Sequence, residues 1–286
     1  MATAWRRGFL TPLVVVLLAT TIFPVVYMVL LALGAPGGDL TPGPFTGLGT
    51  ITTALGSSAL WRAVWLAVIF LAGALVIELA VGVAAALLLD RLAPTNSTIR
   101  MLLLWPAVLP PIAVALIFKF LLQGDIGFIS YYLSKVGVHQ AWLTEPGSAL
   151  GVIIGIDVWQ YTPFVILLTL AALTAFPQDL RDAAAIDGAG VLKVTRYVVL
   201  PVIAPAIVAI ALLRFIDAVQ VFPTIYVLTR GGPGTSTQLL TYYNYQTFFG
   251  ELRFGSGAAI AVFVVAFTLV AVLGLLGLQR RLERAL

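Results

Sequence analysis

Apolar runs long enough to cross a lipid bilayer recur along the whole of this 286-residue sequence. An α-helix rises about 1.5 Å per residue, so about 20 apolar residues span a hydrocarbon core roughly 30 Å thick. Hydrophobic residues make up 61% of the chain and charged residues only 10%, whereas soluble domains carry about 25% charged residues. Lipid offers no hydrogen-bond partners, so the backbone must satisfy itself within helices. The sequence therefore predicts an all-α polytopic membrane protein and excludes a soluble globule; run length and the lack of alternation argue against a β-barrel.

Six membrane-spanning helices in a single domain, residues 1–286, account for these runs. The first run follows Arg6-Arg7 and is too long for a secretory signal; Pro24 inside it predicts a kink. The third run is interrupted by Pro106, Pro110 and Pro111. The predicted spans are residues 9–33, 61–89, 101–123, 150–175, 202–228 and 257–278, with a polar loop at residues 176–201.

Lysine and arginine are unevenly distributed between the two sets of connecting segments. With the N-terminus inside, the basic residues of the inner side outnumber those of the outer side ten to four. This is the bias that the positive-inside rule expects, so both termini and the polar loop are predicted to face the cytoplasm. The inner set is Arg6, Arg7, Arg91, Arg100, Arg181, Lys193, Arg196, Arg280, Arg281 and Arg284, and the outer set is Arg62, Lys135, Arg230 and Arg253.

Residues 176–201 form the longest polar segment on the predicted inner side. Pro177 can begin a helix, since its missing N–H costs nothing in a first turn, and Asp179 then lies near the positive end of the helix dipole. Asp187-Gly188 predicts the turn that ends this helix. A second short helix is expected to run to Leu200-Pro201. The pattern predicts a helix–turn–helix with an alanine-rich surface for a groove on another protein; an ordinary charged loop is the alternative.

The order of residues in this segment resembles the EAA loop of permease subunits in binding-protein-dependent ABC importers. The match consists of Asp182-Ala183-Ala184, Asp187-Gly188-Ala189 and Leu200-Pro201. The sequence departs from that family in having Asp182 where glutamate is usual and Thr195 where an aromatic residue is common. The resemblance implies that this loop is a coupling helix that docks on an ATPase. It assigns the coupling role to Asp182, Ala183, Ala184, Asp187, Gly188 and Ala189.

Other stretches look like the carbohydrate branch of these permeases, and most like the larger membrane subunit of maltose-type importers. They are Leu116-Ile-Phe-Lys-Phe120, Trp159-Gln-Tyr-Thr-Pro-Phe164 and Val227-Leu-Thr-Arg-Gly-Gly-Pro233. The resemblance implies the type I importer permease fold in a bacterial or archaeal inner membrane. It also implies a second permease subunit forming a heterodimer, two ATPase subunits that bind ATP and Mg²⁺, and an extracytoplasmic solute-binding protein. Besides membrane lipid, no cofactor, metal or nucleic acid is expected on this chain.

Five ionisable residues fall inside the predicted spans, where charge is costly and usually lines a polar path. Lys119 lies near the outer end of its span and is expected to snorkel. Glu78 is interpreted equally well as lining a polar path or as making a structural hydrogen bond to a neighbouring helix. Arg214 and Asp217 are three residues apart and are expected to pair with each other. The fifth residue, Asp157, belongs to a polar helix face.

That face predicts a solute site on the fourth span. Residues 157, 160, 161 and 164 are spaced so that they share one side of a helix, because residues three, four and seven positions apart do so. Their side chains are a carboxylate, an amide and two aromatic rings, which suit the binding of a sugar. The fifth span adds a second carboxylate and a second amide. The resemblance points to largely the same residues, and the two carboxylates favour a sugar or polyol other than maltose. Ordinary core packing remains the alternative. The predicted solute-binding residues are Asp157, Gln160, Tyr161, Phe164, Asp217 and Gln220.

The sequence favours a non-catalytic transport subunit. It contains no G-x-x-x-x-G-K-[ST] phosphate-binding loop, so ATP is expected on a separate subunit. The alternative is an ion- or proton-coupled secondary transporter with Asp157 or Glu78 as the proton carrier. Such proteins more often carry internal repeats, and no strong repeat is present. An enzyme is disfavoured because neither a nucleophile–base pair nor a metal-ligand cluster stands out.

Overall fold

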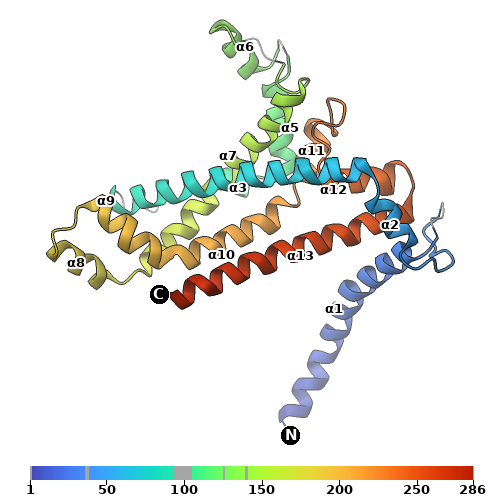
Figure 1. The fold of residues 1–286 in the computed structure, drawn as a ribbon, viewed down its shortest axis with the longest axis horizontal. Coiled ribbons are helices and arrows are strands. Elements are labelled where there is room, and N and C mark those ends of the chain that lie inside the picture. Colours follow the sequence, from blue (N-terminus) through green and yellow to red (C-terminus); the bar gives the residue numbers. More distant parts are fainter. Residues whose placement is uncertain (1, 36–38, 93–104, 125, 139–140, 286) are drawn as a thin grey trace. The chain divides into compact units, whose positions relative to one another are not determined.

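The computed structural model describes residues 2–35, 39–92, 105–124, 126–138 and 141–285. These residues are mostly helical. An isolated antiparallel β-bridge joins Gly34 and Phe45. The prediction of an all-α membrane protein is confirmed (Figure 1). The helices are α1 (Ala2–Leu33), α2 (Gly49–Leu55), α3 (Ser58–Leu92), α5 (Pro111–Leu121), α6 (Phe128–Lys135), α7 (Pro146–Thr174), α8 (Gln178–Ile186), α9 (Val191–Val194), the π-helix η1 (Thr195–Val199), α10 (Leu200–Ala218), α11 (Phe222–Leu228), α12 (Leu240–Tyr245), the π-helix η2 (Gln246–Gly250) and α13 (Phe254–Ala285).

Within the described part of the chain, five helices are long and apolar enough to cross a membrane. Many of their large apolar side chains are exposed, as lipid contact requires and water would not allow. The first, second and sixth predicted spans each fall within one of these helices, and the fourth, 150–175, extends one residue beyond the end of α7. The spanning segments are Leu10–Leu33, Ser58–Arg91, Pro146–Thr174, Val191–Ala218 and Phe254–Arg284.

The third predicted span is divided by its prolines. Residues 101–104 lie outside the described part of the chain. Residues 105–108 are helical, and a new helix, α5, begins at Pro111. Proline lacks the N–H that a helix interior needs and disfavours helical geometry in the residue before it. The predicted interruption is therefore present, and α5 has only 11 residues.

The short helix predicted at the end of the polar loop and the start of the fifth predicted span are one continuous helix. The helix begins at Val191 and continues through η1 and α10 to Ala218, so the second arm of the polar loop is continuous with the membrane helix. Pro201 does not end it, because the π-helical turn immediately before Pro201 accommodates the missing backbone donor. A break follows α10, and α11 restarts with Pro223 in its first turn. The predicted single span 202–228 is thus two helices.

The chain divides into two compact units. Unit 1 comprises Met1–Ala63 and Tyr242–Phe267, and unit 2 comprises Val64–Thr241 and Thr268–Leu286. In unit 1, a small core joins Leu31 and Ala32 of α1 to Ala258 and Ala259 of α13. The residues predicted to bind solute or to couple to an ATPase all belong to unit 2.

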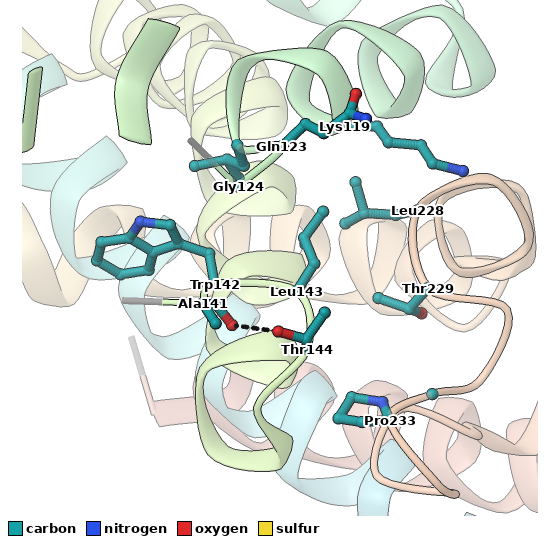
Figure 2. A pocket seen from close by; sticks show the side chains of 12 residues that line it. Lys119, Gln123, Gly124, Ala141, Trp142, Leu143, Thr144, Leu228, Thr229 and Pro233 are labelled. Atoms are coloured by element: carbon teal, nitrogen blue, oxygen red, sulfur yellow. Dashed lines mark hydrogen bonds between the residues drawn. The ribbon is translucent and has the colours of Figure 1, made fainter. Parts of the chain in front are cut away.

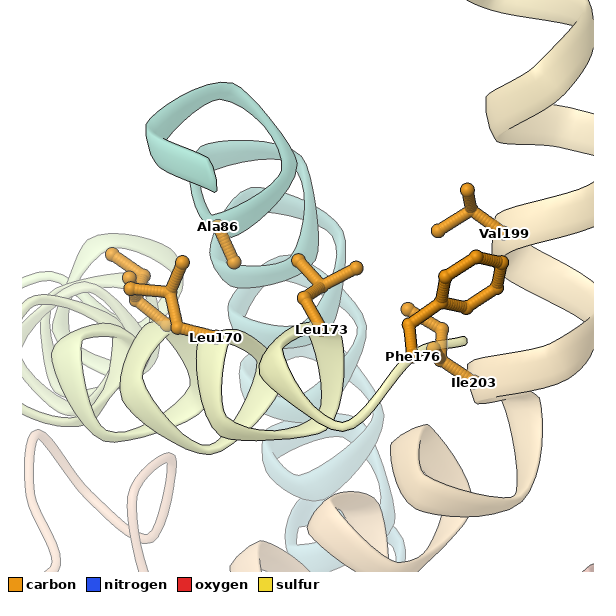
Figure 3. Close-up of a cluster of buried hydrophobic side chains, with 7 residues drawn as sticks. Ala86, Leu170, Leu173, Phe176, Val199 and Ile203 are labelled. Atoms are coloured by element: carbon orange, nitrogen blue, oxygen red, sulfur yellow. The ribbon is translucent and has the colours of Figure 1, made fainter. Parts of the chain in front are cut away.

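The core of unit 2 joins α3, α7 and the η1–α10 helix close to the polar loop. Figure 3 shows Ala86 of α3 directed toward α7, and Phe176 directed toward Val199 and Ile203. Small residues one turn apart on α3, Gly82 and Ala86, allow this close approach, as is typical of helix pairs in membranes. The buried members are Ala86, Ile166, Leu170, Leu173, Phe176, Val199 and Ile203.

Replacing Gly82 with alanine is expected to destabilise this core. A Cβ at position 82 would lie 2.6 Å from Cγ1 and 2.7 Å from Cβ of Val165 on α7, so α3 and α7 would have to separate. Overpacking of this kind costs about 1–3 kcal/mol. We expect the thermal unfolding midpoint in detergent to fall by several degrees. Gly155→Ala on α7 is the matched control, because no atom lies within 4 Å of its added Cβ; equal midpoints for the two variants would contradict the packing described.

Candidate functional site: a polar loop and a buried charge cluster

The first half of the polar loop is the helix α8, which begins directly after Pro177. It ends at Ile186, and Gly188 follows with a φ of +72°, a conformation that residues with a Cβ rarely adopt. The Ala189 N–H donates to the Ala184 carbonyl at 3.0 Å, which satisfies the end of the helix. The structure therefore places the turn at Asp187-Gly188, as the sequence predicted.

The loop exposes apolar side chains between acidic ones. Ile186 is 87% exposed and Leu192 is 80% exposed. Asp182 and Asp187 are also exposed, so this surface combines apolar area with negative charge. Acidic side chains beside exposed apolar ones do not suit contact with lipid and are typical of a protein-binding surface.

Two consecutive residues at the end of α3 contact both halves of the loop. Asp90 accepts a hydrogen bond from Arg181 of α8, with 2.9 Å between Oδ2 and Nη2. Arg91 donates through Nη2 to the Thr195 hydroxyl and, at 3.4 Å, to the carbonyl of Val191. The sequence placed Asp90 and Arg91 in a short polar connection and gave no indication of either partner.

A second group of polar residues surrounds Arg214 within the membrane helices of unit 2. Its guanidinium binds Glu78 of α3 through Nε (2.8 Å) and Nη2 (3.0 Å). Nη2 also donates to Asp157 of α7 at 3.0 Å, and Nη1 donates to Asp217 at 2.7 Å. The ring centroid of Tyr161 lies 4.0 Å from the guanidinium carbon. One arginine thus joins three helices through charge-assisted hydrogen bonds.

Burial divides the cluster into an inner part and an open part. Arg214 is 1% exposed and Glu78 is fully buried, whereas the Asp217 side chain is 56% exposed. The predicted pair Arg214–Asp217 is present. For Glu78 the structural interpretation holds, because its carboxylate binds Arg214 from the neighbouring helix. Three acidic side chains surround one guanidinium.

The predicted solute residues are only partly brought together. Asp157, Tyr161 and Asp217 all contact or neighbour Arg214. Gln160 is buried instead, and its Nε2 donates to the Leu109 carbonyl at 2.9 Å, an acceptor left open by the proline break before α5. Phe164 is half-buried and Gln220 is exposed.

A cavity of about 400 Å³ lies at the end of α7 opposite the polar loop. Figure 2 shows Leu143 and Leu228 facing each other across it, with Trp142 to one side. Lys119 lines the cavity, and its Nζ donates to the Val227 carbonyl at 3.0 Å. The ammonium of Lys119, which the sequence predicts to snorkel, therefore has a backbone acceptor at the wall of this cavity. The sequence did not predict this cavity because its walls come from three separate segments.

The described residues contain no group of three or more histidine, cysteine, aspartate or glutamate side chains placed to hold a metal ion.

Comparison with known proteins shows relatives along nearly the whole chain. The trehalose/maltose transport system permease protein MalF of Thermococcus litoralis is 35% identical over 273 residues, which cover 93% of this chain and 92% of the relative. The trehalose transport system permease protein SugA of Mycobacterium tuberculosis is 31% identical, covering 92% of this chain and 86% of the relative. The sulfoquinovosyl glycerol transport system permease protein SmoG of Agrobacterium fabrum is 30% identical, covering 91% and 85%.

Solved structures show the same fold. A chain of a bacterial alginate ABC transporter, crystallised with an alginate pentasaccharide-bound periplasmic protein, superposes with a TM-score of 0.81 at 21% identity, covering 96% of this chain and 93% of that chain. The family model for the binding-protein-dependent transport system inner membrane component matches residues 78–286, which include the polar loop and the Arg214 cluster. The chain therefore belongs to the family of binding-protein-dependent transport system inner membrane components.

Proposed function

We propose that this chain, acting as one permease domain over residues 1–286, forms half of the pathway through which an ATP-driven importer moves a sugar or related polyol. One observation carries the proposal: the two helices that supply most of the Arg214 cluster, α7 and α10, are the helices that the α8–η1 segment connects. A movement of α8 is thereby transmitted to the polar residues within the membrane. The sugar permeases among the relatives support the choice of solute.

Family membership favours the importer over an ion-coupled secondary transporter, since members are membrane components of systems supplied by a binding protein. The chain is accordingly non-catalytic. ATP and Mg²⁺ belong to two copies of a separate ATPase subunit, and a second permease completes a heterodimer. An extracytoplasmic binding protein delivers the solute. The distribution of basic residues supports a cytoplasmic position for both termini and the polar loop, in a bacterial or archaeal inner membrane whose lipid surrounds the helices. Nucleic acid is not among the proposed partners.

The solute is proposed to meet the open side of the Arg214 cluster. Asp217 and Gln220 are exposed and present a carboxylate and an amide. Tyr161 and Phe164 supply aromatic faces for a sugar ring, while Asp157 and Gln160 are buried behind them and hold their neighbours in place.

The ATPase is proposed to bind the alanine-rich side of α8 and the turn that follows. Exposed apolar and acidic groups there suit a groove with basic residues at its edge. The contact residues are Asp182, Ala183, Ala184, Asp187, Gly188 and Ala189.

The test is uptake by the complete complex in proteoliposomes. The chain is reconstituted with its second permease, its ATPase and its binding protein, and accumulation of a labelled neutral disaccharide is followed. We expect uptake only with ATP and binding protein together. Uptake by this chain alone, driven by a proton or sodium gradient, would instead establish the secondary transporter.

Asp217→Asn is expected to lower this uptake about tenfold, because a hydrogen bond to a charged acceptor contributes about 1.5–3 kcal/mol. Assembly is expected to be normal, since Arg214 keeps its bonds to Glu78 and Asp157. Uptake is measured beside Asp39→Asn, an exposed carboxylate outside the cluster. Equal uptake by the two variants would remove Asp217 from the solute pathway.

A further inference from the structure

We propose that the last turn of α3 takes part in coupling together with the two arms of the polar loop. Asp90 and Arg91 in this turn are positioning residues, and each holds one arm. The first arm is α8 and the second arm is the α9–η1 helix. The proposal rests on the assignment of α8 as the ATPase-binding helix, and it adds a helix that lies outside residues 176–201.

The first arm is held through Arg181. Its guanidinium binds the Asp90 carboxylate at 2.9 Å and lies over the Phe176 ring, 5.2 Å from the ring centroid. The side chains of Arg181 and Asp90 are only 27% and 17% exposed, so water and salt screen this pair less than a surface pair. Phe176 belongs to the buried core of unit 2. Arg181 therefore fastens α8 to α3 and to the end of α7 at once.

The second arm is held through Thr195. Arg91 donates to the Thr195 hydroxyl, and that hydroxyl donates to the Val191 carbonyl at 2.9 Å. Thr195 is the first residue of η1, the π-helical turn that precedes Pro201. The arginine thus contacts the point at which the loop becomes a membrane helix. Its position in the last turn of α3 also favours its charge, because the negative end of the helix dipole lies there.

The two arms are joined by a turn at Gly188, about which they could bend if the contacts with α3 were absent. Gly188 has positive φ, and no atom lies within 4 Å of the position that a Cβ would take there. A cavity of about 230 Å³ separates the loop from α3, with Leu87, Asp90, Arg91, Arg181 and Val191 among its lining residues. The contacts made by Asp90 and Arg91 bridge this space. They prevent the arms from bending about Gly188 when force is applied to α8.

The same helix reaches the polar cluster. Glu78 lies on α3 twelve residues before Asp90, a distance of about 18 Å along the helix axis. It binds Arg214 through two hydrogen bonds. Movement of α8 is therefore transmitted to Arg214 along α3 as well as through α7 and α10, and loss of the α3 contacts is expected to separate ATP hydrolysis from transport.

The experiment measures solute molecules imported per ATP hydrolysed in the reconstituted complex. Asp90→Arg is expected to reduce this ratio about tenfold while the complex still hydrolyses ATP. The charge exchange, Asp90→Arg with Arg181→Asp, is expected to restore most of it. Thr195→Val removes the second arm's acceptor with little change in volume and is expected to lower the ratio likewise. The matched control is Glu251→Gln, which breaks an exposed pair with Arg253 at 3.4 Å and is expected to leave the ratio unchanged.

The outcomes separate this proposal from the one on which it rests. If the unmodified complex shows no ATP-dependent uptake, the proposed function itself fails. If that complex transports, but Asp90→Arg and Thr195→Val keep its ratio, the role of α3 is overturned. Should Asp90→Arg fail to assemble, Thr195→Val decides alone: an unchanged ratio contradicts the proposal and a lowered ratio in an assembled complex supports it. A merely structural role would lower yield or thermal stability without changing the ratio.

Discussion

Arg214→Leu is expected to prevent the protein from accumulating as a folded membrane component. The change leaves Glu78 and Asp157 buried without their cation, and Asp217 without its neighbour. Removing one partner of a buried ion pair costs about 3–5 kcal/mol, a large share of the roughly 5–15 kcal/mol that keeps a typical protein folded. The measurement is the yield of monodisperse protein in detergent together with its thermal unfolding midpoint.

Three further variants show whether charge or side-chain volume is responsible. Arg253→Leu removes an exposed arginine and is expected to have little effect. Arg214→Lys keeps the charge but lacks the planar guanidinium, whose N–H groups reach three acidic side chains, so an intermediate yield is expected. Arg214→Met combined with Glu78→Gln and Asp157→Asn removes the buried charges together and is expected to recover part of the yield. Normal yield and midpoint for Arg214→Leu would contradict the role given to the cluster.

Gly188→Val is expected to abolish ATP-dependent uptake while leaving the membrane helices folded. No atom lies within 4 Å of an added Cβ, so the effect comes from the backbone and not from a clash. The φ of +72° costs an L-residue about 1–2 kcal/mol, and more for a β-branched one. Valine therefore destabilises the turn that ends α8, and the exposed surface of α8 is no longer held in the position that the ATPase is proposed to bind. Uptake in proteoliposomes is the measurement.

The neighbouring glycine supplies the control. Gly190 also has open space around it, but its φ of −66° suits any residue, so Gly190→Val is expected to transport normally. Gly188→Asn is expected to keep much of the uptake, since asparagine adopts positive φ more readily than other side chains. Equal uptake by Gly188→Val and Gly190→Val would show that the geometry of this turn is unimportant.

Local sequence rules were enough for the features set by neighbouring residues. Hydrophobic run length located most of the long apolar helices, the Asp187-Gly188 pair located the end of α8, and the three-residue spacing located the Arg214–Asp217 pair. Each depends on residues close together in the chain, where helix geometry alone fixes the distance.

The features missed were those that depend on the packing of distant segments. Glu78 and Arg214 are 136 residues apart, and Gln160 and Leu109 are 51 apart, so no periodicity connects them. A shared helix face showed that residues 157, 160, 161 and 164 point the same way, but not what that face meets. The continuity of the segment from Val191 with α10 was missed for a different reason, because Pro201 suggested a boundary between a short helix and the fifth span.

Residues 176–201 are proposed to carry ATPase movement into the membrane helices, and cross-linking tests this role most directly. The chain contains no cysteine, so a cysteine introduced at Ala184 is the single thiol that this chain brings to the complex. In the assembled complex, a thiol-to-amine cross-linker is expected to join Ala184→Cys to the ATPase and to stop uptake, whereas a cysteine at Thr144, beyond the other end of α7, is expected to give no such product. An ATPase cross-link from Thr144→Cys but none from Ala184→Cys would contradict the account.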